Sequence, residues 1–316
     1  MPTTIQQLPS TALLKPQTTI SPKRPPRRPT PAETLPAIRD RATFIEAHTV
    51  QAKLLKNYLE CPQKGYVRLP SAITRQLDLR RKRELYANNA WSRIAFADTV
   101  VSCVLAHEGV QAGPVFLVTL AIADHTVALA EAKDFDCRRV KGLTRQALRG
   151  IPFVGMIEAA LYRNFGCDGP QIGDFVSWHA HVLTWGASRK AINDAVEQIQ
   201  CSRSALIPDR NCIHVKQLTP TSLGGKLYYV LKGPQKEYRI YSRGERIDPE
   251  TGEVLGPVYR QSKRLLRTGD RARLCYAFED RLLDQLLFGN LEGTELVRAI
   301  RHEVLKPFRA WEKRQR

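Results

Sequence analysis

The order of strand-like and helix-like segments between residues 114 and 218 constrains the fold of this chain more than any other feature. Four segments rich in β-branched and aliphatic residues predict strands, and two segments with apolar residues at helical spacing lie between them. The predicted strands are residues 114–127, 152–163, 177–186 and 211–218, and the predicted helices are residues 134–149 and 188–201. Glycines, a proline and aspartates over 164–174 predict a loop, so we expect the second and third strands to form a hairpin.

This succession of strand, helix, strand, strand, helix and strand predicts the α+β class, with a ferredoxin-like βαββαβ antiparallel sheet. Both helices would cover one face of the sheet, and the other face would stay open for a site. We expect helical additions on the N-terminal and C-terminal sides. Because unrelated proteins share this topology, the function has to be argued from side chains.

The part of the chain before the first strand divides by composition. Residues 1–37 are rich in Pro, Thr, Ser and Gln and contain a basic run over 22–29, which predicts a disordered basic arm. This arm either adds nonspecific phosphate contacts or has no role. Residues 38–110 predict a helical accessory region, whose basic run over 79–83 either grips a DNA backbone or forms a solvated helix face.

Residues 242–316 are predicted to form a basic, mainly helical C-terminal region. A turn between short strands is expected over 248–252, and helices are expected over 270–288 and 294–311. The lysines and arginines between Tyr259 and Arg273 suit phosphate contacts, with aromatic residues nearby for base stacking.

The charge of the chain favours a polyanionic partner, and nucleic acid is the first candidate. The sequence holds 49 Lys plus Arg against 31 Asp plus Glu, a formal net charge of +18. No apolar run approaches the roughly 20 residues of a membrane-spanning helix, and no signal-peptide pattern begins the chain, so we expect a cytoplasmic protein. The 7 cysteines contain no C-x-x-C pair, which fits neither a disulfide framework nor a zinc knuckle.

Two histidines lie in the third predicted strand, Ser177–Gly186. Strand side chains alternate between faces, so His179 and His181 share one face at a spacing of roughly 6 to 7 Å. Two neutral imidazoles can bind one divalent ion that also takes oxygen ligands. A His-apolar-His triplet also arises by chance, so the alternative is a pair that binds nothing.

Glu158 lies inside the otherwise apolar second strand. A buried carboxylate needs a cation or a hydrogen-bond partner. In the expected hairpin Glu158 lies near the level of His179 and His181, where it would be the third ligand of a catalytic metal. The alternative is an edge-exposed glutamate without a partner.

Two tyrosines follow the fourth strand. Gly224 and Gly225 predict a turn or a flexible start, and residues 226–232 predict a short helix. Tyr229 and Lys232 would share one helix face, with Tyr229 as a nucleophile for a phosphodiester and Lys232 stabilising an oxygen. Tyr228 is turned about 100° away and is the alternative nucleophile. Both tyrosines can instead pack on the sheet, and Tyr238 and Tyr241 also lie nearby in the sequence.

The histidine strand, the acidic residue on the strand before it and the tyrosine with its lysine after the fourth strand resemble the HUH endonuclease superfamily, especially rolling-circle replication initiators. The resemblance covers about residues 114–235 and implies a nuclease domain over 111–241. It implies that His179, His181 and Glu158 bind Mg²⁺ or Mn²⁺. It also implies that Tyr229, helped by Lys232, cleaves one DNA strand and stays linked to its 5′ phosphate.

The resemblance therefore implies a site-specific enzyme that nicks and rejoins DNA, initiating rolling-circle replication of a plasmid, phage or integrated element. Its DNA would be a single-stranded or hairpin origin, and a host helicase and polymerase would be partners. A transposase or a relaxase of the same superfamily is an alternative. Relaxases rank lower because neither a third histidine nor an N-terminal tyrosine is evident. The other alternative is a non-catalytic nucleic-acid-binding protein that stacks bases on the sheet, as RNA-recognition modules do.

Overall fold

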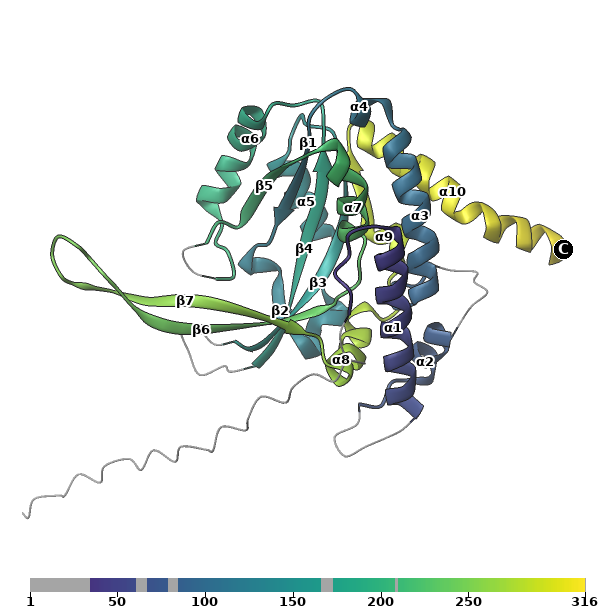
Figure 1. Ribbon diagram of the computed structural model, residues 1–316, viewed down its shortest axis with the longest axis horizontal. Helices are drawn as coiled ribbons and strands as arrows, with labels where there is room; N and C mark the ends of the chain where they lie inside the picture. The colour runs from purple at the N-terminus through teal and green to yellow at the C-terminus, as the bar shows by residue number, and fades with distance from the viewer. Residues whose placement is uncertain (1–34, 61–66, 79–84, 166–172, 208–209, 316) are drawn as a thin grey trace, which may run out of the picture. The chain divides into compact units, whose positions relative to one another are not determined.

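An antiparallel hairpin of two long strands, β3 (Phe153–Phe165) and β4 (Gly173–Thr184), lies at the centre of the sheet (Figure 1). Its register pairs Glu158 with His179 and Met156 with His181. Both strands consist mainly of apolar residues that are buried, so the hairpin is held by packing on both faces. The predicted pairing of the second and third strands is confirmed.

The computed structural model describes residues 35–60, 67–78, 85–165, 173–207 and 210–315. The predicted basic arm, apart from residues 35–37, and the basic run over 79–83 lie outside these ranges, as does most of the loop predicted over 164–174. Residues 35–316 belong to one compact unit. The described helices include none that is both long enough and apolar enough to cross a membrane.

The sheet combines antiparallel and parallel pairing. Its strands run in the order β5 (Ile213–Leu218), β1 (Val115–Leu120), β4, β3, β6 (Lys236–Ile247), β7 (Val254–Leu265). The pairs β5–β1, β1–β4, β4–β3 and β6–β7 are antiparallel, whereas β3 and β6 are parallel. With the helices described below, this sheet confirms the predicted α+β class.

The predicted strand over 114–127 is wrong in its extent. β1 ends at Leu120, and a short 3₁₀ helix over Ala123–His125 precedes β2 (Thr126–Ala128), which pairs with the first part of β4. Asp124 interrupts the apolar run and reaches Arg203, with 2.7 Å between carboxylate and guanidinium. A charged residue that finds its partner at the surface ends the buried strand at this point.

Two helices lie on the face of the sheet opposite the histidines. α5 (Arg138–Ala147) and α6 (Arg189–Ser202) contact each other, and they pack on β4 and β5 respectively. The Ser188 hydroxyl accepts a hydrogen bond from the Ala191 amide at 3.2 Å and so caps the N-terminus of α6. On this face the indole of Trp178 is fully buried and stacks on Phe135, just before α5.

The histidine face is covered by helices and its polar residues are buried, so the prediction of an open sheet face is wrong. The covering helices are α1 (Arg41–Glu60) and α3 (Ala90–Ala106), together with α7 (Pro220–Val230), and the three contact one another. Phe44 of α1 and Phe96 of α3 belong to the same buried core as the strands. The shorter helices α2 (Ser71–Asp78) and α4 (Glu108–Gln111) complete this side.

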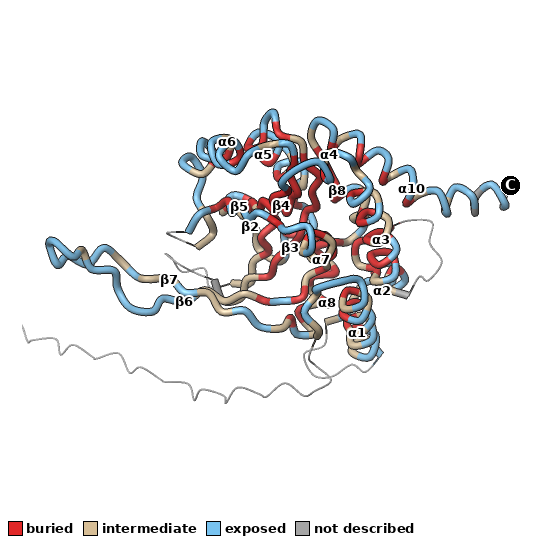
Figure 2. The backbone as a smooth tube through the Cα atoms, turned by 45° about the horizontal axis from the view of Figure 1, so that its top comes forward, coloured by how far each residue is buried: buried red, intermediate tan, exposed pale blue. Residues whose placement is uncertain are grey.

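The strands β6 and β7 form a long hairpin that extends from the sheet and is mostly exposed towards its tip (Figures 1 and 2). The turn predicted over 248–252 lies at this tip, but the strands on either side of it are 12 residues each rather than short. Of the six lysines and arginines in the basic stretch predicted to contact phosphates, three lie exposed on β7, namely Arg260, Lys263 and Arg264.

The predicted helix over 270–288 is wrong, because two helices and a strand occupy this region. α8 (Thr268–Phe278) and α9 (Leu283–Leu286) precede β8 (Leu287–Asn290), which pairs with the start of β3. Glu279 has a φ of 34°, so the helix cannot continue through it. α10 (Glu292–Gln315) includes the helix predicted over 294–311.

Candidate active site

The structure brings Glu158, His179 and His181 together on one face of the central hairpin, and all three side chains are buried. The two histidine Nε2 atoms lie 3.1 Å apart. Glu158 Oε2 lies 3.2 Å from Nε2 of His181 and 3.7 Å from Nε2 of His179. Direct pairing of Glu158 with His179 across the hairpin produces this convergence.

Two of these separations, 3.1 and 3.2 Å, match those of neighbouring ligand atoms around one ion, and the third, 3.7 Å, is longer. Two atoms about 2.1 Å from an ion, at right-angled or tetrahedral positions, lie roughly 3.0–3.4 Å from each other. The combination of two imidazole nitrogens and one carboxylate oxygen suits a divalent metal ion. Since only three ligand atoms come from the protein, further positions would be open to water or substrate.

Hydrogen bonds at the Nδ1 atoms orient both imidazole rings. Nδ1 of His179 lies 3.2 Å from the Ser177 carbonyl, which only accepts, so Nδ1 carries the proton and Nε2 presents a lone pair. Nδ1 of His181 lies 2.8 Å from the Thr119 hydroxyl of β1, which can donate or accept. Sequence reasoning missed Thr119, whose position follows only from the pairing of Thr119 with His181 across β1 and β4.

The protonation states favour cation binding at neutral pH. Burial lowers the pKa of His179 to about 4 and also lowers the pKa of His181. Burial alone would raise the pKa of Glu158, but the Lys232 ammonium and the two imidazoles outweigh it and hold that pKa at about 2. Two neutral imidazoles therefore face one charged carboxylate, as metal binding requires.

Lys232 is the cationic partner of this cluster. Its Nζ donates a hydrogen bond to Oε2 of Glu158, and both side chains are nearly buried. The ammonium also lies 4.4 Å from the centroid of the Tyr229 ring. Lys232 thus neutralises the carboxylate and links the three candidate ligands to the candidate nucleophile.

Tyr229 lies beside the histidines, whereas Tyr228 does not. The ring centroid of Tyr229 is 6.0 Å from that of His181, and the residue is partly exposed. Tyr228 points towards α3 and donates a hydrogen bond to Oδ1 of Asp98 at 3.1 Å. Burial, followed by Asp98, raises the pKa of Tyr228 to about 12. The expected turn of about 100° between neighbouring helical positions separates the two phenols.

The helix that carries Tyr229 begins and ends earlier than predicted, and because it ends at Val230, the prediction that Lys232 shares a helix face with Tyr229 is wrong. α7 begins at Pro220, after a capping box of Thr219 and Ser222, so the prediction of a turn or flexible start at Gly224 and Gly225 is wrong. These glycines lie inside the helix. A Cβ on Gly225 would lie 2.1 Å from the carbonyl oxygen of Arg39, so this glycine permits the backbone before α1 to approach α7 closely.

Side chains distant in sequence hold the chain directly after α7. Arg93 donates to the carbonyls of Leu231 and Ala87, at 3.1 and 2.8 Å. Nε2 of His48 accepts from the Gly233 amide at 3.3 Å. Arg93 and His48 therefore fix the backbone on both sides of Lys232. Local sequence patterns carry no signal for these contacts, because 138 and 185 residues separate the partners.

The two later tyrosines of the region occupy β6. Tyr238 stacks on Tyr162 of β3, with ring centroids 5.1 Å apart, and burial raises the pKa of Tyr238. Tyr241 is exposed on the hairpin.

Comparisons of the chain with protein-family models, with curated proteins and with solved structures find no match.

Proposed function

We propose that this protein is an HUH-type endonuclease, which nicks and rejoins single-stranded DNA through a 5′-phosphotyrosine intermediate. One observation carries the proposal: Glu158, His179 and His181 converge beside Tyr229 and Lys232 on one sheet face. The strand order β5, β1, β4, β3 supports it, because a ferredoxin-like βαββαβ sheet has its four strands in this arrangement. In this proposal the enzyme initiates rolling-circle replication of a plasmid, phage or integrated element.

A divalent ion, Mg²⁺ or Mn²⁺, would be held by Glu158, His179 and His181 and would supply Lewis-acid polarisation of the scissile phosphate. The protein's own contribution is to fix the ligand atoms before binding. Thr119 and the Ser177 carbonyl orient the imidazoles, and β3 sets the carboxylate at the same level. Preorganisation of this kind is what makes electrostatic stabilisation effective.

Tyr229 is the nucleophile of the proposed reaction. Its phenolic oxygen forms a bond to phosphorus, and the bond between phosphorus and the 3′ oxygen breaks. The phenol releases its proton to solvent, and the departing 3′ oxygen takes up a proton to become a hydroxyl. Lys232, whose Nζ lies 4.4 Å from the ring centroid, stabilises the developing phenolate. Attack by a 3′ hydroxyl on the phosphotyrosine reverses the step and rejoins a strand.

The net charge of +18 suits the phosphate backbone of the proposed substrate. The β6–β7 hairpin pairs directly with β3, and exposed Arg243, Arg260 and Lys263 lie along it. We assign these residues to backbone contacts with a single-stranded or hairpin origin. A host polymerase would extend the free 3′ hydroxyl, and a host helicase would separate the strands.

The rival function, base stacking on the sheet by a non-catalytic protein, receives less support from the site. Trp178 and Trp185 are fully buried, so neither offers a stacking surface. The histidine face carries three buried polar groups in contact with one another, which suits an ion better than a base.

The test is a covalent adduct assay with a matched pair of tyrosine variants. Purified protein with Mn²⁺ and a single-stranded origin oligonucleotide should give a protein–DNA adduct. Tyr229→Phe should abolish it, and Tyr228→Phe should leave its yield unchanged, because Tyr228 is bonded to Asp98 away from the cluster. An adduct of full yield in Tyr229→Phe would refute the assignment of the nucleophile.

A further inference from the structure

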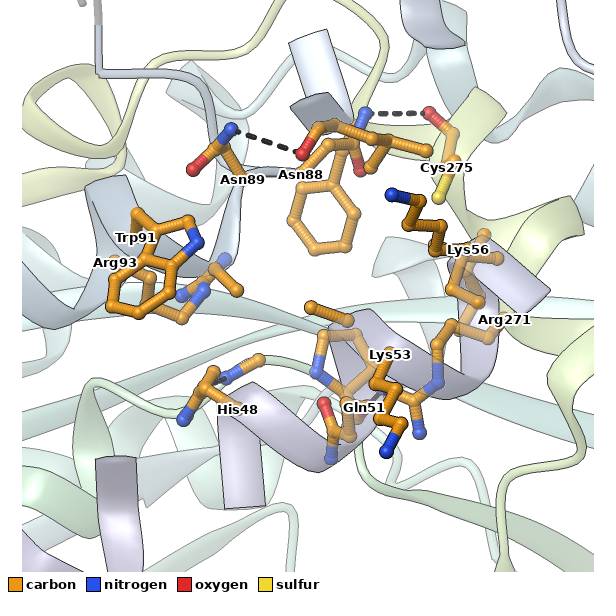
Figure 3. Close-up of a pocket in the computed structure, with 18 of the residues that line it drawn as sticks. His48, Gln51, Lys53, Lys56, Asn88, Asn89, Trp91, Arg93, Arg271 and Cys275 are labelled. Atoms are coloured by element: carbon orange, nitrogen blue, oxygen red, sulfur yellow. Dashed lines mark hydrogen bonds between the residues drawn. The ribbon is translucent and has the colours of Figure 1, made fainter. Parts of the chain in front are cut away.

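A cavity of about 440 Å³ lies between α1, α3 and α8, and its lining includes His48 and Arg93, which hold the chain after α7 (Figure 3). Its size is in the range of small-molecule sites, roughly 300–1,000 Å³. None of the three candidate metal ligands lines it. The polar groups on its walls include Gln51, Lys53, Lys56, Trp91, Arg93 and Arg271.

Two arginines on these walls have no carboxylate partner among the described residues. Arg93 is buried, and its guanidinium donates hydrogen bonds to the carbonyls of Leu231 and Ala87. Arg271 is partly buried and donates to the Pro234 carbonyl at 3.3 Å. Burial lowers the pKa of each to about 10, and the carboxylate that acts on Arg93 through space, Glu158, is already bonded to Lys232. Buried cations without a counter-charge are unfavourable, so an anion in the cavity would complement them.

A buried amide on α1 adds an unused donor. Gln51 is 6 % exposed, and its Nε2 has no hydrogen-bond partner in the structure. Lys53 and Lys56 of the same helix are exposed at the rim. An anionic oxygen would satisfy the amide and receive charge-assisted hydrogen bonds from the arginines.

The remaining walls are apolar. Leu55, Leu274 and Phe278 are buried side chains that line the cavity, and Trp91, which also lines it, is 47 % exposed. An inorganic anion alone would leave this surface without a contact. A ligand with an anionic group and a flat, largely apolar group would use both kinds of wall.

We propose that the cavity binds a nucleoside phosphate. The phosphate is bound by Arg271, Arg93 and the Gln51 amide, and the base packs on the apolar wall beside Trp91. The same chemistry is offered by a free nucleotide and by one nucleotide of a DNA strand. The site does not depend on the proposed nuclease activity, because its residues are separate from Glu158, His179 and His181.

Isothermal titration calorimetry of the full-length, metal-free protein tests the proposal. We expect dTMP and dAMP to bind at one site per chain, inorganic phosphate to compete with them, and the uncharged nucleosides to bind about tenfold or more weakly. Tighter binding of a 5′-phosphorylated oligo(dT) than of dTMP would identify the source as a strand, and the reverse order would identify a free nucleotide.

Matched variants localise the binding. Arg271→Met should lower the affinity for dTMP by about tenfold or more, and Gln51→Leu should lower this affinity to a smaller degree. Arg273→Met, two positions along α8, is the control, because Arg273 pairs with Asp174 and Asp270 instead. The proposal fails if no probe binds, or if Arg271→Met and Gln51→Leu both bind dTMP as the unmodified protein does.

Discussion

Two groups of buried charges in this protein are balanced in opposite ways. In the candidate active site, the carboxylate of Glu158 contacts the Lys232 ammonium and two imidazoles, so its negative charge is compensated inside the protein. On the cavity wall, Arg93 and Arg271 meet only carbonyl oxygens among their hydrogen-bond partners. The charges of the first group compensate one another without a ligand, whereas the second group keeps an excess of positive charge.

This difference indicates what each region can bind. At the active site an incoming cation would share Glu158 with Lys232, so the ammonium holds the carboxylate charged and in position until an ion arrives. In the cavity neither arginine is paired with a carboxylate of the described residues, and Glu60, which also lines the cavity, pairs with Lys56 instead. The two regions meet at residues 231–234, whose backbone is held by Arg93, His48 and Arg271.

The largest expected effect comes from breaking the internal compensation at the active site. Lys232→Met leaves the buried carboxylate of Glu158 without its cation, so we expect the metal-free protein to lose about 3–5 kcal/mol of unfolding free energy. Mn²⁺ should restore much of this loss, since an ion replaces the missing positive charge. Chemical denaturation with and without Mn²⁺ measures both effects.

A double variant controls for the loss of packing by the lysine stem. Lys232→Met with Glu158→Gln removes both charges, and it should be more stable than Lys232→Met alone. Equal stability of the single and double variants would show that Glu158 and Lys232 do not compensate each other.

The next effect concerns His48, which lines the cavity and accepts from the Gly233 amide. Burial, reinforced by Arg93, lowers the pKa of His48 to about 3, so the folded protein binds its proton less readily than the unfolded chain. The stability that His48 contributes is therefore present above pH 6.5 and is lost as the pH falls towards 3. At pH 5 this loss is about 2 kcal/mol.

Urea unfolding from pH 7 to pH 5 of the unmodified protein and of His48→Gln measures this contribution. The variant should lose about 2 kcal/mol less over this interval, while His302→Gln, at an exposed histidine of α10, should behave as the unmodified protein does. If the unfolding free energies of His48→Gln and the unmodified protein changed by the same amount between pH 7 and pH 5, His48 would not make this contribution.

The smallest effect is expected from removing a cavity charge. Arg271→Met should change the unfolding free energy by less than about 1 kcal/mol, because the loss of one hydrogen bond to Pro234 is offset by relief of an uncompensated charge. Thermal unfolding in the absence of added anions is the measurement. A loss as large as that of Lys232→Met would remove the contrast between the two regions.

The sequence was sufficient for the parts of the site that depend on strand alternation. His179 and His181 share a face because strand side chains alternate, and Glu158 lies opposite them because β3 and β4 pair as a hairpin. The separation of Tyr229 from Tyr228 followed from helical geometry in the same way. These are local rules that hold wherever the element forms.

The incorrect predictions concern positions whose local structure depends on a segment that is distant in the sequence. Gly225 lies inside α7, where it permits the close approach of Arg39, and residues 287–290 form a strand because they pair with the start of β3. The sequence next to these positions carries no trace of such partners. The cavity was not foreseen for the same reason, since α1, α3 and α8 contribute its walls from far apart in the chain.

A Mn²⁺ titration followed by electron paramagnetic resonance tests the central claim most directly. We predict that each chain binds one Mn²⁺ ion. His179→Ala and His181→Ala should each lower the affinity for Mn²⁺ by about 100-fold or more. His214→Ala, at an exposed histidine of β5, should bind Mn²⁺ with unchanged affinity. Binding of the same strength in both cluster variants would show that Glu158, His179 and His181 do not hold the ion.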